Sequence, residues 1–476
     1  MSLPRHALRY FVRTTLGWSW LAAALAAQTT PANDPLLQPL PEFVRPAPGQ
    51  PLPGSEQQFD QLLSLAATNS PAMREQEETV SQANADRFRS WMRHTPAITA
   101  SYSVGAFYQT NASGTSDSTL TPGGSFTLTA SEPLWHWGGF DAQTELGILT
   151  EEKAQNDAVI AYAKLCLDLR KRYYDLIVQK ALAAMLAREV DSAKNRYDKA
   201  HLLFENGNAT QAHVHELELD WKSLQTRQED TDETFNAQLA DFRRLTGSSS
   251  FAAEDLPDHI FLPMLDQPGL QAQNENFEKN GVNQSLAARS ADLNEKALDR
   301  KITMSNASRR PMFDLAASVS QQPYINAANN GLKFGTIFFV GVTGSWSLFD
   351  RGESFAATQA LYSQKRVAEN QFVDTRELTK NDADHSLRLI NLGLRALDLL
   401  KSQYAQQQED YSRVQILAST GQTEQTDLDD SRDALLDTRQ QILSRQADVA
   451  DAYYSFLSDI FQDPALVNAP PYTKPR

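Results

Sequence analysis

The sequence has a single cysteine, Cys166, among 476 residues. One thiol cannot form an internal disulfide, and it cannot supply a multi-cysteine zinc site. We interpret Cys166 as a small packed residue of a long helix. Basic residues are also outnumbered, because 44 Lys and Arg stand against 59 Asp and Glu, for a formal net charge of −15. This balance argues against non-specific nucleic-acid binding, which needs clustered positive charge.

Long hydrophobic runs are missing as well. After the first 30 residues no stretch approaches 18 uninterrupted apolar positions, which excludes a bundle of transmembrane helices. At the start, Arg5, Arg9 and Arg13 precede the apolar stretch 16–27, which ends in small residues. This order is typical of a secretory signal peptide, so we predict one over residues 1–26. An uncleaved amphipathic anchor is the alternative interpretation.

Proline is concentrated near the ends and absent from two long inner segments. Eight prolines between residues 31 and 53 predict an extended arm over residues 27–54. A second proline-rich stretch predicts a disordered tail over residues 464–476. No proline lies between Pro133 and Pro257, or between Pro323 and Pro464. These two segments are rich in Ala, Leu, Gln, Glu, Lys and Arg, a composition that favours helix.

The inner segments also show helical periodicity. Apolar residues recur at steps of three and four from Val159 to Leu176 and from Val214 to Phe242. This spacing predicts one apolar stripe on each helix and coiled-coil-like packing. A single helix over residues 142–204 would be about 95 Å long. A helix of that length does not fit within a compact globular domain, so we predict long rod-like helices.

The segments before these rods have a period of two instead. In residues 97–108 the side chains of Ile98, Tyr102 and Val104 fall on one face, and those of Ser101 and Ser103 fall on the other. Such alternation predicts a strand with one apolar and one polar side. Similar strands follow at residues 126–130, 313–319 and 334–346. Small polar residues at 111–124 and 326–331 predict two exposed hairpin tips.

The two halves of the chain repeat. Residues 134–138, Gly207 and Phe242 each have a counterpart 214 positions later, at residues 348–352, Gly421 and Phe456. We therefore predict two tandem repeats of helix, strand, strand, long helix and helix, over residues 55–247 and 269–463, with a linker at 248–268. Four strands cannot close a membrane barrel, which needs about eight. An open sheet in lipid would leave backbone polar groups unpaired, so the strands must close with those of other copies.

This order of elements resembles the TolC-type outer membrane efflux family. The resemblance rests on the tandem halves, the Leu-Phe-Asp-x-Gly step at residues 348–352 and the helix break that begins at Thr420-Gly421, and it covers roughly residues 55–462. It implies a mainly α protein with transmembrane β: a homotrimer with a 12-stranded barrel in the outer membrane. The helices would continue it through the periplasm as an α-helical barrel. A periplasmic adaptor protein and an inner-membrane pump or ABC transporter would dock at the far end.

The resemblance also assigns roles to the helix tips. Asp427 and Asp430 stand where the family places two aspartates that line the closed entrance, and Thr423 stands where an arginine can help to latch it. The matching positions of the first half are His213 and Glu216. The alternative is that the aspartates belong to a solvated acidic face. Six residues are expected at the adaptor-docking tips: Asn206, Gly207, Asn208, Thr420, Gly421 and Gln422. An ordinary helix cap without a partner is the alternative there.

Enzyme interpretations find little support. His213 and His215 are two apart, so they point to different helix faces and do not form the i, i+4 pair of a zincin. The sequence has no phosphate-cradling glycine-rich loop and no Gly-x-Ser-x-Gly elbow. We therefore predict a non-enzymatic export duct without metal or cofactor, in the outer membrane of a Gram-negative cell. The alternative is a non-conducting periplasmic coiled-coil protein that its strands anchor in the outer membrane.

Overall fold

The structure is a computed structural model, and it describes residues 55–473 apart from 108–120, 259, 261–264 and 327–330. The chain divides into two units, residues 1–42 and 43–476, and the described residues belong to the second. The predicted signal peptide, the proline-rich arm and most of both hairpin tips lie outside the described residues. Among the described residues, no helix combines the length and the hydropathy needed to cross a membrane.

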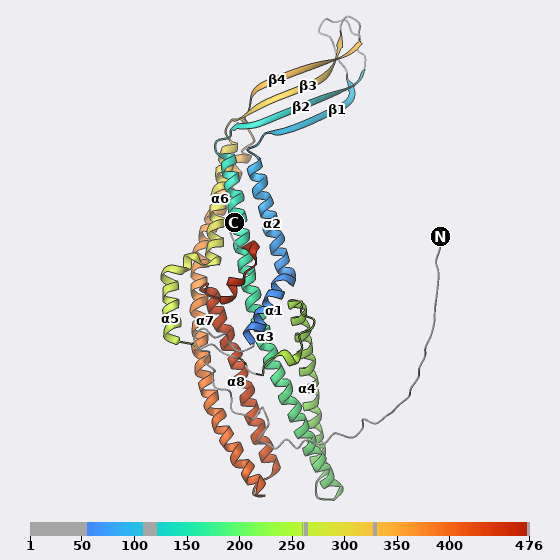
Figure 1. Cartoon of the computed structure of the whole chain (residues 1–476), viewed down its shortest axis with the longest axis vertical. Helices are drawn as coiled ribbons and strands as arrows, with labels where there is room; N and C mark the ends of the chain where they lie inside the picture. Colours follow the sequence, from blue (N-terminus) through green and yellow to red (C-terminus); the bar gives the residue numbers. More distant parts are fainter. Residues whose placement is uncertain (1–54, 108–120, 259, 261–264, 327–330, 474–476) are drawn as a thin grey trace, which may run out of the picture. The chain divides into compact units, whose positions relative to one another are not determined.

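The elements follow the predicted order in both halves (Figure 1). The first half contains α1 (Ser55–Asn69), α2 (Pro71–Met92), β1 (Ala97–Phe107), β2 (Thr121–Trp135), α3 (Gly139–Glu205) and α4 (Gln211–Thr246). The second contains α5 (Gln267–Asn276), α6 (Leu286–Ser308), β3 (Met312–Asn326), β4 (Gly331–Ser345), α7 (Glu353–Ser419) and α8 (Gln425–Asp459). The prediction of a mainly α fold with four strands is confirmed. The leading helix of each half, expected in one piece, is broken at Pro71 and around residues 277–285.

The repeat is visible in the backbone itself. Every described residue with positive φ has a partner 214 positions away, namely Trp137 and Arg351, Gly138 and Gly352, Gly207 and Gly421, and Gly247 and Phe461. The long helices α3 and α7 both have 67 residues, which corresponds to about 100 Å each. Phe242 and Phe456, also 214 apart, are both 0% exposed. The same local geometry therefore recurs at each turn of the two halves.

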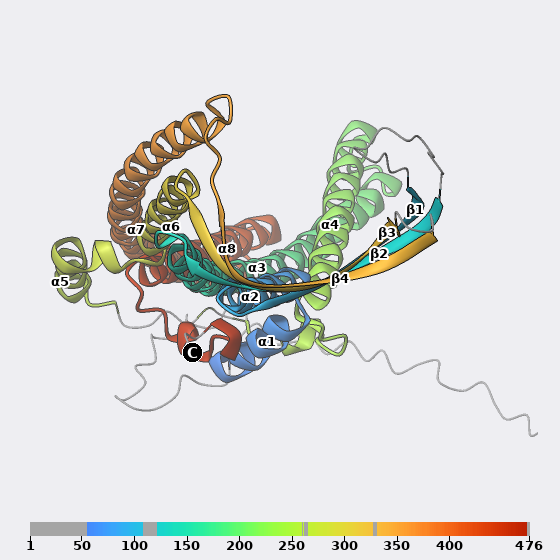
Figure 2. The same cartoon turned by 90° about the horizontal axis from the view of Figure 1, so that it is seen from above.

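The four strands form one antiparallel sheet in the order β1-β2-β3-β4 (Figure 2). The register places Tyr102 opposite Phe126, Leu128 opposite Val319, and Val319 opposite Phe338, so these side chains share one face. Tyr102 is 82% exposed and Phe338 is 75% exposed. The other face carries mostly Ser and Thr, such as Ser103 and Ser125, whose hydroxyls lie 2.7 Å apart. The expected division into an apolar and a polar face thus holds for β1 and β2, whereas β4 also places Ile337 and Phe339 on the polar face.

The prediction of a disordered C-terminal tail is wrong for residues 464–473. They form two short 3-10 helices, Pro464–Asn468 and Pro471–Thr473. Asp463 anchors them, because its carboxylate accepts hydrogen bonds from Nη1 and Nη2 of the buried Arg170 at 2.5 and 2.9 Å. The Tyr472 hydroxyl donates to the Met73 carbonyl at 3.2 Å. Proline content alone wrongly predicts disorder here, because the residues that hold this segment in place come from α2 and α3.

The linker between the halves is also held in place. Phe251, Leu256 and Ile260 are buried, at 2 to 4% exposure. Lys180 Nζ of α3 donates to the Leu256 carbonyl at 2.7 Å. Cys166 is buried too, and burial raises the pKa of its thiol to about 12. A neutral thiol in that place agrees with the interpretation of Cys166 as a packed residue.

Candidate functional site at the helix tips

Two glycine turns connect the long helices to the shorter ones. Gly207 has φ 75° and Gly421 has φ 70°, a conformation that favours glycine because it has no Cβ. The Asn208 amide donates to the Leu203 carbonyl at 2.7 Å, and the Gln422 amide donates to the Leu417 carbonyl at 2.9 Å. This bond pattern is that of a Schellman C-cap. A Cβ added at either glycine would meet no atom within 4 Å, so both tips are open to their surroundings.

The first-half candidates lie at the start of α4. The His213 amide donates to Oγ1 of the N-cap Thr210 at 3.3 Å, which fixes the first turn of the helix. His213 Nδ1 lies 3.8 Å from Glu216 Oε2 on the same face. His215 pairs instead with Glu218, at 3.5 Å. In the part of the chain that the structure describes, no three His, Cys, Asp or Glu side chains group as metal ligands would.

The second-half candidates lie at the start of α8. Asp427 Oδ2 accepts a hydrogen bond from Thr423 Oγ1 at 2.5 Å, one turn earlier. Asp430 Oδ1 lies 3.6 Å from Arg196 Nη1 of α3, and its side chain is 70% exposed. The two aspartates are thus exposed but have different partners. Asp427 is tied to its own turn, whereas Asp430 joins α8 to the long helix of the other half.

Behind these exposed aspartates lie two half-buried carboxyls, Glu189 of α3 and Asp433 of α8. Burial raises the pKa of the Asp433 carboxyl, while Arg432 and Arg196 oppose that rise. Burial also raises the pKa of Glu189, and the charge of Asp433 adds to the effect. Carboxyl groups therefore continue from the tips onto the contact between α3 and α8, where burial favours their neutral form.

Sequence reasoning missed the contribution of α3 to this site. Arg196 and Glu189 carry no motif, and they lie in a uniform helical stretch more than 200 residues from Asp430. Only the packing of α3 against α8 brings them together. Thr423, at the position where the resemblance suggests an arginine, has a local partner instead. A cross-helix arginine contact is present nonetheless, through Arg196.

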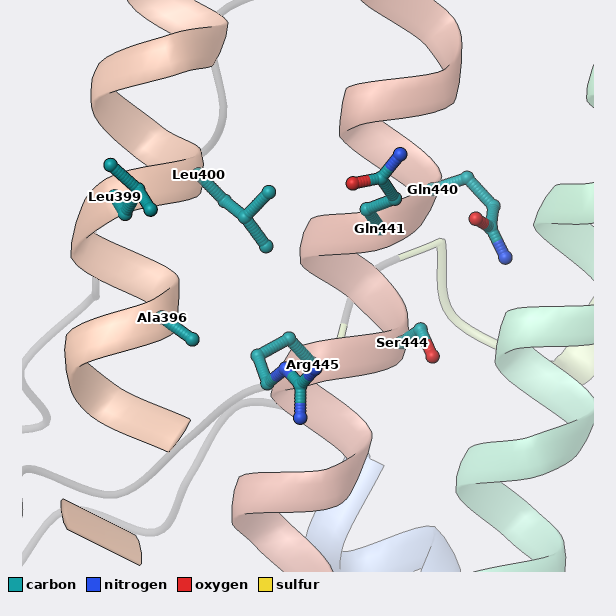
Figure 3. Close-up of a pocket in the computed structure, with 7 residues that line it drawn as sticks. All are labelled: Ala396, Leu399, Leu400, Gln440, Gln441, Ser444 and Arg445. Carbon is teal, nitrogen blue, oxygen red and sulfur yellow. The ribbon is translucent and has the colours of Figure 1, made fainter. Parts of the chain in front are cut away.

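A surface groove runs between α7 and α8, away from the tips (Figure 3). Its volume is about 320 Å³. Ala396, Leu399 and Leu400 of α7 line one wall. The wall from α8 is polar, with Gln440, Gln441, Ser444 and Arg445. Arg445 is paired with Asp448 at 3.2 Å. The groove therefore has one apolar wall, from α7, and one polar wall, from α8.

The fold and the tips together define a class of proteins, in which a four-stranded sheet is joined to paired helices about 100 Å long. Residues 62–248 match the family model described as outer membrane efflux protein. No curated protein matches the chain by sequence.

Solved structures with the same fold extend the comparison over most of the chain. The outer membrane protein VceC from Vibrio cholerae is 13% identical, with a TM-score of 0.67 over 85% of this chain and 96% of that one. The CmeC outer membrane channel of Campylobacter jejuni is 13% identical, with a TM-score of 0.70 over 87% and 89%. The open state of the MtrE outer membrane channel of Neisseria gonorrhoeae is 13% identical, with a TM-score of 0.62 over 84% of this chain and 88% of that one. Residues 62–248 thus match the outer membrane efflux protein family, and the chain as a whole shares the fold of these outer membrane channels.

Proposed function

We propose that this protein is a passive exit duct in the outer membrane, which conducts cargo delivered by an inner-membrane pump. One observation carries the proposal: a sheet with an exposed apolar face is joined directly to helices of 67 residues. The sheet face suits lipid, and the helices suit the distance across a periplasm. A pore confined to the membrane would need only the strands.

The strand arithmetic and the similarity to this family support assembly as a homotrimer. β1 and β4 are the outer strands of the sheet, so one copy does not close a barrel. Exposed sheet edges cannot remain unpaired in lipid, because their backbone groups would lose hydrogen bonds. Pairing β4 of each copy with β1 of the next closes a barrel, and three copies give twelve strands. The helices would then form a hollow tube on the same axis.

The helix tips would meet the partners of the duct. Asn206, Gly207 and Asn208, with Thr420, Gly421 and Gln422, would contact a periplasmic adaptor protein, and an inner-membrane pump or ABC transporter would supply the energy. Open space around both glycines supports this role. The family does not distinguish drug efflux, metal efflux and type I secretion, because the pump selects the cargo.

The entrance to the tube would lie beside these tips. In a trimer, Asp427 and Asp430 would form two rings of carboxylates that attract cations. His213 and Glu216 would occupy the matching positions of the first half. Thr423 would hold Asp427 within its own turn. The contact between Arg196 and Asp430 would act as a latch, since it holds α8 against α3 and must change if the helices separate.

The mass of the purified protein in detergent tests this assembly. We expect light scattering, corrected for bound detergent, to give three chains per particle. A single-chain mass under conditions that preserve helical circular dichroism would contradict the proposal. A trimer that never conducts ions would favour the alternative, a structural protein anchored in the outer membrane.

A further inference from the structure

The junction between sheet and helices carries a compact group of aromatic and basic side chains. Five residues, which we call the junction cluster, form it: Trp135, Trp137, Arg309, Arg310 and Trp346. They come from the end of β2, the turn before α3, the end of α6 and the end of β4 (Figure 1). Within the proposed duct, this level is where the barrel meets the periplasmic leaflet of the membrane.

The tryptophans of the junction cluster are fixed by hydrogen bonds. Trp137 Nε1 donates to the Pro311 carbonyl at 2.6 Å, and Trp346 Nε1 donates to the Arg309 carbonyl at 3.2 Å. Trp135 packs edge-on against Trp137, with ring centroids 5.8 Å apart. Trp135 and Trp346 are nevertheless 58% exposed. Indoles with a satisfied N–H and an exposed ring are typical of the interface between lipid and water.

Trp135 lies on the apolar side of the sheet. Trp135 is opposite Phe313, which in turn is opposite Gly344, and Leu315 and Val342 follow on the same face. Trp346 directly follows the last residue of β4. The neighbouring Leu348 and Phe349 are 77% and 84% exposed. The junction cluster therefore continues the apolar face to its helix-side border, where aromatic girdles occur in membrane barrels.

Each of the two arginines lies beside an aromatic ring of the junction. The Arg310 guanidinium carbon lies 5.0 Å from the Trp137 ring centroid, and that of Arg309 lies 5.9 Å from the Phe355 ring centroid. Stacking on aromatic rings orients a guanidinium and leaves its N–H groups available. Among the described residues, neither arginine side chain has a hydrogen bond or an ion pair with a carboxylate.

Three carboxylates of the neighbouring elements have other partners or lie on the sheet. Asp314 lies on the polar side of the sheet, with Oδ1 2.7 Å from His136 Nε2. Asp350 accepts hydrogen bonds from the amides of Gly352 and Ser354 at 3.0 and 2.9 Å, at the start of α7. Glu132 is exposed on the apolar face, within β2. Two arginines without an internal counter-ion thus border an apolar aromatic surface, which fits a ligand with an anionic head and an apolar tail.

We propose that the junction cluster binds an anionic phospholipid, with Arg309 and Arg310 on the headgroup phosphate and the tryptophan rings against the upper acyl chains. Guanidinium groups bind phosphate through paired N–H donors. A zwitterionic headgroup is a weaker ligand for them, because its own ammonium group competes for the phosphate. The inference rests on the proposed function, since it needs the strands to lie in a membrane. It adds a ligand class and two residues that recognise it.

Titration of delipidated, detergent-purified protein with short-chain phosphatidylglycerol tests the inference, with native mass spectrometry as the readout. Phosphatidylethanolamine and inorganic phosphate serve as competing probes. We expect phosphatidylglycerol to bind more tightly than phosphatidylethanolamine. Each of Arg309→Gln and Arg310→Gln should weaken it roughly fivefold, and the double variant about 25-fold. The single variants keep the test informative if the double variant fails to fold.

Two matched controls complete the experiment. Arg413→Gln removes an exposed arginine near the tip of α7, and Glu132→Gln removes a charge from the apolar face. Both should retain tight phosphatidylglycerol binding. Equal binding of the two lipids, or full binding by the double variant, would overturn the inference. Displacement by millimolar inorganic phosphate would identify a free-phosphate site instead of a lipid site. A trimer that conducts ions without lipid preference would refute only this inference, not the proposed duct.

Discussion

At the scale of single residues, Asp427 and Asp430 are similar side chains that have different interaction partners. Asp427 interacts with Thr423 in the turn before α8, and Asp430 lies near Arg196 of α3. Removal of Asp427 should therefore change local charge, whereas removal of Asp430 should also release a contact between helices. Exposed ion pairs contribute about 0 to 1 kcal/mol to stability, so neither change should unfold the protein.

We predict that Asp427→Ala combined with Asp430→Ala lowers the cation selectivity of the pore and its block by multivalent cations. The physical reason is the loss of two carboxylate rings at the entrance. Reversal potentials in asymmetric KCl across a planar bilayer measure the effect. Asp258→Ala, which removes one exposed carboxylate paired with Lys180, controls for the loss of a carboxylate elsewhere in the chain. Unchanged selectivity in a folded trimer would place both aspartates outside the lumen.

At the scale of elements, much of the fold follows from the sequence. The offset of 214 residues, the long proline-free segments and the alternating strand residues predict the order of elements and the two faces of the sheet. β2 and β3 are longer than predicted. For β2 the reason is the pattern near residues 121–125, which is rich in Gly, Ser and Thr and also suits a loop. The packed tail and the contact of Arg196 with Asp430 could not be predicted, since both depend on tertiary contacts between segments more than 200 residues apart.

The packing of α8 against α7 should give the protein a pH-dependent stability. Burial, together with the nearby Asp382, raises the pKa of Asp459 to about 7. The folded state then binds a proton more readily than the unfolded state, whose carboxyl has a pKa near 4. Stability contributed by the protonated form is present below about pH 4 and is lost as the pH rises to about 7.

Asp459→Asn removes this titration and keeps a side chain that can accept from Ser386 Oγ, which lies 3.5 Å from Asp459 Oδ2. We predict that the variant melts at a higher temperature than the parent at pH 8, and that the difference shrinks as the pH falls to 4. Thermal unfolding followed by circular dichroism across this range provides the measurement. The exposed Asp220→Asn controls for the loss of one charge. A parent and variant with parallel pH profiles would show that Asp459 does not titrate in this window.

The glycine turns provide a second prediction at this scale. Replacement of Gly207 and Gly421 by valine strains the backbone, because both have positive φ, and it adds bulk at the tips. We expect export to be lost while trimers remain in the membrane, as judged by cargo retention and by crosslinking of the assembly. Gly393→Ala is not a suitable control, since a Cβ there would lie 2.3 Å from Val449 Cγ2. Gly105→Ala, in β1 with no atom within 4 Å, is the matched glycine change. Normal export by the double valine variant would remove the docking role of the tips.

At the scale of the whole molecule, the two ends of the chain's long helices have different chemistry. The sheet end presents an apolar face and the junction cluster, which suit lipid. The tip end presents open glycine turns, exposed aspartates and the half-buried Glu189 and Asp433, which suit water, cations and a protein partner. In the proposed function, these two ends connect a membrane to a distant docking point. Both the duct and the anchored scaffold need that division of roles, so conductance is the property that separates them.

Single-channel recording of the purified, unmodified protein in a planar lipid bilayer tests this account most directly. The account predicts discrete, long-lived conductance steps that favour cations over anions. Detergent alone and heat-denatured protein provide the baseline. Trimers that insert into the bilayer, as shown by protease protection of the strands, yet pass no current at any voltage or pH would contradict the central claim that this protein is a channel.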